Sequence, residues 1–162
     1  RARLEDENFL EQTRQALERH HQLTFELLET SFYDTPSDEL LFKLDTQREI
    51  GITLEMDDFG TGHASVKALQ ALKPDAVKID RSLVSPLGKN LNQLDILKNL
   101  AGIARLEGAR VIVEGLETGK HMAAMRSLDC DALQGYVLQR PMGEFEFTAL
   151  INERTKELQT LE

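Results

Sequence analysis

The sequence has few of the features that mark secreted, membrane-spanning or nucleic-acid-binding proteins. Its single cysteine, Cys130, excludes an internal disulfide, and no apolar run approaches the roughly 18 residues of a membrane span. No signal-peptide apolar region follows Arg1, and the net charge is −9. Binding DNA or RNA phosphates requires clustered Lys and Arg, so we expect no DNA partner. The lack of a long apolar run, a signal peptide and an internal disulfide predicts no membrane contact by this chain and a cytoplasmic setting.

The sequence does have the composition of a packed domain. Hydrophobic residues make up 41% and charged residues 29% of the 162 residues, which suits one domain with one core. The chain begins with Arg1 rather than Met, so we interpret it as a piece of a longer protein.

Strand and helix patterns alternate along the chain. Short apolar runs bounded by turns predict strands over 23–29, 52–56, 76–80, 110–114 and 132–136. Helical periodicity covers 5–20, 35–49, 64–72, 91–106, 119–128 and 143–158. Thr35 is the expected N-cap of the second helix and Gly51 its end. This alternation predicts parallel strands joined by crossover helices.

The remaining choice lies between an open doubly wound sheet and a barrel. A polar residue falls within or at the C-terminal end of each strand: Glu26, Asp57 with Asp58, Lys78, Glu114 and Gln134. The strand ends of a barrel meet at one mouth, whereas a doubly wound sheet collects its ligand residues at one switch point. We therefore predict an α/β fold, an incomplete TIM-type (β/α) barrel of about five parallel strands with helices.

Convergence of these strands would bring four carboxylates together, those of Glu26, Asp57, Asp58 and Glu114. Their mutual repulsion requires neutralisation, and divalent cations are the simplest remedy. Ligands that are all oxygen favour Mg²⁺ or Mn²⁺, and two adjacent acids could serve two ions about 3.5–4 Å apart for attack on phosphorus. Lys78 could steady charge on a phosphate oxygen or orient the attacking water.

Six stretches of the chain together carry a resemblance to a known family. They are 26–31 (ELLETS), 57–63 (DDFGTGH), 78–80 (KID), 113–118 (VEGLET), 134–136 (QGY) and 140–141 (RP). In this order they resemble the EAL-domain phosphodiesterases, which hydrolyse the second messenger cyclic di-GMP to linear pGpG. The resemblance implies a modified TIM barrel with two Mg²⁺ or Mn²⁺ ions and cyclic di-GMP as substrate.

The resemblance also implies roles for individual residues. The implied metal ligands are Glu26, Asp57, Asp58 and Glu114. The implied catalytic groups are Asp57, Lys78, which contacts the catalytic water, and Glu117, a supporting acid. The implied substrate-binding residues are Gln134, Asp80 and Arg140. Glu29 resembles the anchor of a flexible loop that contains Gly60, Thr61 and Gly62.

The chain departs from the family near its beginning. The Glu-Ala-Leu motif, whose Glu is a metal ligand in the family, does not occur, and a family Asn ligand is absent just before Arg1. A complete barrel has eight strands and typically about 250 residues. We therefore interpret residues 1–162 as a partial EAL domain without its N-terminal third, weakly active or inactive alone.

An incomplete barrel would leave two strand edges and an apolar face open to water, an arrangement that proteins avoid. This predicts either a homo-oligomer or the remnant of a longer polypeptide. The longer protein could carry sensory or GGDEF domains upstream and could be anchored to a membrane.

Plainer interpretations accompany these. Asp57-Asp58 alone is typical of an exposed loop, and Lys78 could protect an edge strand from pairing. His121 is expected to face solvent, and Cys130 to be a small packing residue. The alternative function is a non-catalytic EAL-like receptor for cyclic di-GMP or a protein-interaction module; the retained carboxylates and Lys78 favour the enzyme.

Overall fold

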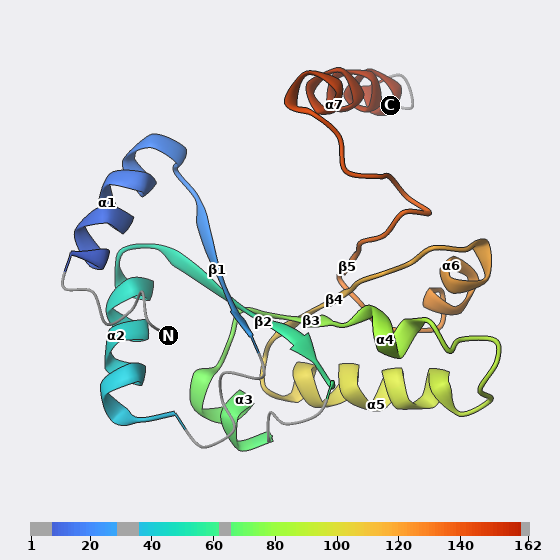
Figure 1. Cartoon of the computed structure of the whole chain (residues 1–162), viewed down its shortest axis with the longest axis horizontal. Coiled ribbons are helices and arrows are strands. Elements are labelled where there is room, and N and C mark those ends of the chain that lie inside the picture. Colours follow the sequence, from blue (N-terminus) through green and yellow to red (C-terminus); the bar gives the residue numbers. More distant parts are fainter. Residues whose placement is uncertain (1–7, 29–35, 62–65, 160–162) are drawn as a thin grey trace.

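A computed structural model describes residues 8–28, 36–61 and 66–159 of the chain (Figure 1). The strands are β1 (Leu23–Leu28), β2 (Ile52–Phe59), β3 (Ala76–Ile79), β4 (Arg110–Val113) and β5 (Ala132–Leu133). The helices are α1 (Phe9–His20), α2 (Asp38–Glu49), α3 (Val66–Leu72), α4 (Arg81–Val84), α5 (Gln93–Leu106), α6 (Gly119–Met125) and α7 (Glu144–Gln159). The predicted loop residues Glu29 and Gly62 lie outside the described residues.

The five strands form one parallel sheet in the order β1-β2-β3-β4-β5. Each strand therefore lies beside its neighbour in the sequence, without the reversal of order that defines a doubly wound sheet. This arrangement is the wall of a (β/α) barrel, as the positions of the polar residues predict. Within the described part of the chain, β1 and β5 each have a strand neighbour on one side only.

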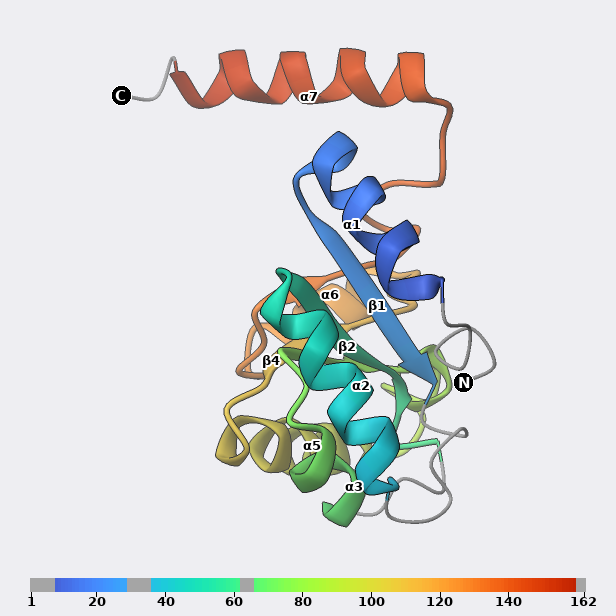
Figure 2. The ribbon, with the colours of Figure 1, turned by 90° about the vertical axis from the view of Figure 1, so that its left-hand side faces the viewer.

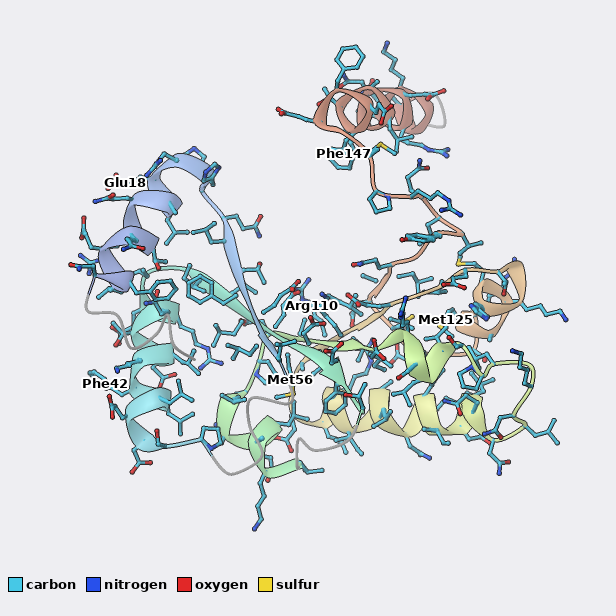
Figure 3. The ribbon with its side chains drawn as sticks, in the orientation of Figure 1. Glu18, Phe42, Met56, Arg110, Met125 and Phe147 are labelled. Atoms are coloured by element: carbon cyan, nitrogen blue, oxygen red, sulfur yellow. The ribbon has the colours of Figure 1, made fainter. Side chains whose placement is uncertain are left out.

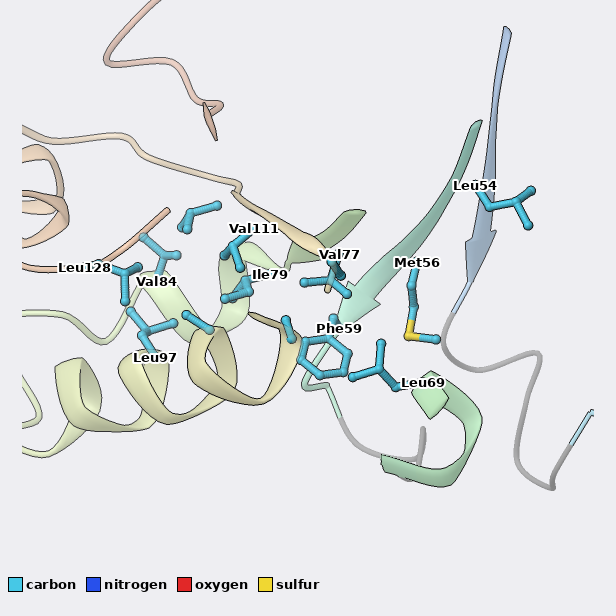
Figure 4. Packing of buried hydrophobic residues seen from close by; sticks show 14 of the residues in the cluster. Leu54, Met56, Phe59, Leu69, Val77, Ile79, Val84, Leu97, Val111 and Leu128 are labelled. Carbon is cyan, nitrogen blue, oxygen red and sulfur yellow. The ribbon is translucent and has the colours of Figure 1, made fainter. Parts of the chain in front are cut away.

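The core lies between the sheet and the helices α2, α3 and α5. Strand β2 alternates buried and partly exposed side chains, with Leu54 and Met56 completely buried. They pack with Leu69 of α3 and Val77 of β3 on the helix side of the sheet (Figure 4). Full burial of a side chain of this size contributes about 1.5–3 kcal/mol, so this layer holds the sheet in place.

Two aspartates, each just before a strand, bind the backbone of the neighbouring strand: Asp75 joins the start of β3 to β2, and Asp131 joins the start of β5 to β4. The Asp75 carboxylate accepts a hydrogen bond from the Leu54 N–H at 2.7 Å, and the Asp75 N–H donates to Leu54 O. The Asp131 carboxylate accepts from Val111 N–H, also at 2.7 Å, and its N–H donates to Val111 O. These paired bonds help to set the register of β3 and β5, on which the position of the site depends.

The expected N-cap of α2 is wrong. Ser37 is the N-cap: its backbone is extended, and its Oγ accepts the Leu40 N–H at 3.3 Å. The hydroxyl of Ser37 lies three residues before that amide, the spacing a capping side chain needs. Thr35 lies outside the described residues. Gly51 follows the helix at φ +98°, a conformation that favours glycine, as predicted.

Strand β5 is shorter than the predicted 132–136. After Leu133 the chain turns to hydrogen-bond Leu116, whose N–H donates to Gln134 O and whose carbonyl accepts from Val137 N–H. Gly135 lies so close that a Cβ there would be 2.7 Å from the Leu116 carbonyl carbon. The sequence pattern also gave no sign of the one-turn helix α4.

Helix α7 stands away from the sheet (Figures 1 and 2). None of its described side chains is buried, and Phe145 is 86% exposed. The helix predicted over 143–158 is therefore present, but none of its described side chains packs into the core. Over the described residues, no helix is long and apolar enough to cross a membrane.

Candidate active site

The predicted site residues of four strands lie on the face of the sheet opposite the core. Lys78 pairs with Ile112, and Ile112 lies two residues before Glu114. Asp57 pairs with Leu28, and Leu28 lies two residues after Glu26. Since side chains alternate along a strand, Glu26, Lys78 and Glu114 share the face of β2 that carries Asp57. Helices α2, α3 and α5 lie on the other face (Figures 1 and 3).

The Asp57-Asp58 pair occupies an irregularity in strand β2. Met56 pairs with Val77 and Phe59 with Ile79, so two residues of β2 oppose the single residue Lys78. This is the count of a β-bulge, and Asp58 has the φ of +57° that an inserted residue can adopt. The bulge returns Phe59 to the buried face and leaves both aspartates partly exposed. The acids therefore lie within the strand, beyond its predicted end at Met56.

Lys78 is the centre of the site. Its Nζ lies 2.9 Å from Glu26 Oε1, 2.8 Å from Glu114 Oε1 and 3.4 Å from Asp57 Oδ1. The residue is only 8% exposed, in the middle strand of the sheet. The interpretation of Lys78 as the protector of an edge strand is therefore wrong, because β3 has strands on both sides.

These contacts fix the charge of Lys78. Burial acts to lower the pKa of Lys78, but its contacts with the Glu114 and Glu26 carboxylates and the charges of Glu114 and Asp57 outweigh burial and raise that pKa above its usual range. The side chain is therefore an ammonium at any physiological pH. It can attract an anionic group or orient water, and it cannot act as a general base at neutral pH.

The segment after β4 is held against its neighbours. The Glu114 N–H donates to Ile79 O at 3.0 Å, and Leu116 bonds to the 134–137 segment. Between them, Gly115 adopts φ +71° and faces Arg81, where a Cβ would lie 2.8 Å from the Arg81 Cα. Only glycine fits this close approach, so Gly115 determines where Glu114 and Glu117 are placed.

A pocket of about 450 Å³ lies beside this turn. Four predicted site residues line it: Glu114, Glu117, Gln134 and Arg140. Arg81 and Tyr136 line it too, and the Arg140 guanidinium carbon lies 4.7 Å from the centre of the Tyr136 ring. The pocket thus combines carboxylates, guanidinium groups and an aromatic ring, the side chains that suit a ligand with phosphates and flat bases.

Asp80 lies outside this pocket lining. It is the N-cap of α4, with Oδ1 accepting the Ser82 N–H at 2.9 Å. Burial acts to raise the pKa of Asp80, but hydrogen bonds from Ser82 and Arg81 lower it below the usual value. Its visible contacts are those of a helix cap that stays ionised.

The loop after the bulge begins at Gly60 and Thr61. Gly60 has φ +92° and packs on Leu83 and Leu100, while the N–H and hydroxyl of Thr61 both donate to Asp58 O, at 3.2 and 2.9 Å. These contacts hold the backbone of Asp58 in its bulged conformation.

Comparison with protein families identifies the family of the chain. The sequence model of the EAL domain matches residues 1–141. The chain belongs to the EAL-domain family.

Relatives of this EAL domain include proteins with named activities. The cyclic di-GMP phosphodiesterase NbdA of Pseudomonas aeruginosa is 34% identical over 105 residues, which are 65% of this chain and 13% of NbdA. The structure of the P. aeruginosa MucR phosphodiesterase in complex with c-di-GMP matches with a TM-score of 0.78 at 29% identity, covering 90% of this chain and 60% of that one. A manganese/cy-diGMP complex of Klebsiella pneumoniae BlrP1 has a TM-score of 0.72 at 23% identity over 82% of this chain and 35% of that one. The chain therefore spans only part of each of these proteins.

The carboxylates of this EAL domain suit a hard cation. Among the described residues, no three acidic, His or Cys side chains are already arranged as a metal site, and the Lys78 ammonium lies among the carboxylates instead. Glu114 Oε1 is buried, and its contact at 2.8 Å is the ion pair with Lys78. An oxygen-only donor set fits Mg²⁺ or Mn²⁺.

Reasoning from the sequence missed three residues of this EAL domain. Arg81 and Tyr136 line the pocket, and Glu55 shares the site face with Asp57. Glu55 Oε1 lies 3.9 Å from Nη2 of Arg110, which is labelled in Figure 3. The alternation of β2 could have placed Glu55 beside Asp57; nothing local in the sequence indicated Arg81.

Proposed function

We propose that this chain is the C-terminal part of a cyclic di-GMP phosphodiesterase domain, which in complete form hydrolyses c-di-GMP to pGpG. The single observation that carries the proposal is the convergence of Glu26, Asp57 and Glu114 on Lys78 beside a pocket lined by Gln134 and Arg140. The names of NbdA and the MucR complex support the same substrate.

Two Mg²⁺ or Mn²⁺ ions held by Glu26, Asp57, Asp58 and Glu114 would supply Lewis-acid activation of the phosphodiester and of the attacking water. The chain's own residues have separate tasks. Lys78 keeps a positive charge next to the carboxylates and orients the water. Glu117 supports the site from the same turn as Glu114, and Asp80 holds α4 so that Arg81 lines the pocket.

The pocket would bind the substrate by charge and stacking. Arg140 and Arg81 offer guanidinium groups to phosphate oxygens, and the Tyr136 ring offers a flat surface to a guanine. Gln134 provides amide donors and acceptors at the wall of the same pocket.

We also propose that the chain is weakly active alone, because the Glu-Ala-Leu motif does not occur in it. The test incubates the 162-residue chain with c-di-GMP and Mn²⁺ and follows pGpG by chromatography, while calorimetry measures c-di-GMP binding. We expect binding, slow turnover, and loss of turnover in Glu26→Gln. The control Glu18→Gln, on the exposed surface of α1, should behave as wild type. Turnover that survives in Glu26→Gln would contradict the proposal.

The alternative function is a non-catalytic receptor, in which Lys78 would keep its ion pairs with Glu26 and Glu114 as structural contacts. A receptor would bind c-di-GMP equally well with and without Mn²⁺ and would form no pGpG at any enzyme concentration, so the same experiment separates the two functions.

We propose further that the open edges of the sheet pair with a second copy or with further strands of a longer protein. Strand β1 has one neighbour among the described residues, and its Leu28 is 47% exposed. The bifunctional diguanylate cyclase/phosphodiesterase MucR, of which the chain covers 16%, supports an additional upstream domain. Light scattering after size-exclusion chromatography should show a dimer or larger species; a stable monomer at high concentration would argue against self-association.

A further inference from the structure

His121 is a buried histidine that the proposed chemistry does not use. It lies in the first turn of α6 and is 8% exposed, so the expectation that it faces solvent is wrong. Burying an imidazole requires partners for its nitrogens. Its partner is the turn that carries Glu114 and Glu117.

The contacts of His121 form a reciprocal cap. Thr118 is the N-cap of α6, and its Oγ1 accepts the His121 N–H at 3.2 Å. The His121 Nδ1 in turn accepts the Glu117 N–H at 3.2 Å. In a capping box, a Glu or Gln at this third helical position reaches back to the backbone before the helix. Here an imidazole does so, one residue earlier in the chain.

Because Nδ1 is the acceptor, the neutral ring carries its proton on Nε2. The ring lines a second pocket of about 330 Å³, which Glu117 also lines. The other charged residues that line this pocket are Lys89 from the segment between α4 and α5, Lys120 from α6 itself, and Glu117 from the turn. Glu117 thus lines both the active-site pocket and this second pocket. The hydrogen bond from its N–H to His121 holds its backbone on the side of the second pocket.

The turn is attached at three places. Glu114 bonds to β3, Leu116 bonds to the 134–137 segment, and the Glu117 N–H bonds to His121. We propose that His121 is a positioning residue that holds Glu117 at the active-site pocket. The effect of His121 on catalysis rests on the proposed function. Its effect on the position of Glu117 rests on the observed hydrogen bond.

The test compares His121→Gln, which keeps an acceptor, with His121→Leu, which keeps the bulk and removes the acceptor. His21→Gln, at an exposed histidine after α1, is the matched control. Nuclear magnetic resonance on the 162-residue chain follows the ring nitrogens of His121 and the amide proton of Glu117. Calorimetry with c-di-GMP and Mn²⁺ measures the affinity of each variant.

In the wild type we expect an Nε2-protonated ring and a Glu117 amide that is protected from hydrogen exchange. His121→Leu should expose that amide to exchange at least tenfold faster and weaken c-di-GMP binding about tenfold. His121→Gln should restore both. A Glu117 amide whose exchange is unchanged in His121→Leu, or is not restored in His121→Gln, overturns the inference. Absence of c-di-GMP binding by the wild type would contradict the proposed function instead. The hydrogen exchange of the Glu117 amide would then test the positioning role by itself.

Discussion

Lys78 Nζ lies 2.8 Å from Glu114 Oε1, and this ion pair joins the middle strand of the sheet to the turn beyond β4. Both side chains are largely withdrawn from solvent, at 10% and 18% exposure. Breaking such a pair leaves an uncompensated charge, which is more destabilising than the pair itself is stabilising. Lys78 therefore serves the fold as well as the site, since Glu26 and Asp57 share the same ammonium.

Substituting Lys78→Met should destabilise the chain by up to roughly 3 kcal/mol at pH 7, because the carboxylates around it lose their counter-charge. Breaking a fully buried pair costs roughly 3–5 kcal/mol, and the Glu26 side chain is half exposed. The pKa of Lys78 is raised in the folded protein, so its contribution is complete below the unfolded pKa and is lost only as the pH rises through the folded value. Urea unfolding of the wild type should thus show no loss from Lys78 between pH 6 and 9.

In Lys78→Met the carboxylates around residue 78 lose the ammonium that opposes their mutual repulsion. The stability lost by the substitution should therefore be partly recovered when Mn²⁺ is added. Unfolding of Lys78→Met that Mn²⁺ does not affect would contradict this expectation.

Substituting Asp58→Gly should separate stability from function. Asp58 has φ +57°, a conformation that is strained for most residues and free for glycine, and Asp58→Ala should therefore be less stable than Asp58→Gly by about 1 kcal/mol. Both variants remove a proposed metal ligand, so both should lose Mn²⁺-dependent turnover to a similar degree. Thermal unfolding and the pGpG assay measure the two effects; equal stability of the variants would contradict the bulged conformation.

Substituting Gly115→Ala should lower the melting temperature and reduce c-di-GMP binding. A Cβ at this position meets the Arg81 backbone, and φ is +71°, so either the turn or α4 must move. The control is Gly102→Ala in helix α5, where a Cβ meets nothing within 4 Å. The control should stabilise the chain by roughly 0.5–1 kcal/mol through helix propensity. Similar effects of the two substitutions would rule out the close approach of Gly115 to Arg81.

Cys130 should react slowly with iodoacetamide. Burial raises the pKa of the Cys130 thiol, and the charges of Asp131 and Asp129 add to this while Arg105 partly opposes it. The thiolate fraction at pH 7.5 is therefore smaller than that of an ordinary cysteine. The rate of alkylation, measured by mass spectrometry, should keep rising above pH 9, and faster reaction than glutathione at pH 7.5 would contradict the expectation.

Much of the fold could be read from local patterns. The alternation of strands and helices, the approximate bounds of β1 to β4 and the gathering of Glu26, Asp57 and Glu114 on one face follow from periodicity and from polar residues at strand ends. The family resemblance added Glu117 and Arg140, which line one pocket with Gln134. These features depend on neighbours in the sequence, so the sequence itself determines them.

Other features depend on contacts between distant segments, which only the tertiary structure decides. The end of β5 is set by hydrogen bonds to Leu116, and the burial of His121 by its bond to the Glu117 backbone. Lys78 became a central ammonium only because three strands bring their carboxylates to it, and Arg81 became part of the pocket only because Gly115 lets it approach. The sequence specified which groups can do chemistry; packing across strands decided their distances, and electrostatic interactions over those distances set their charges.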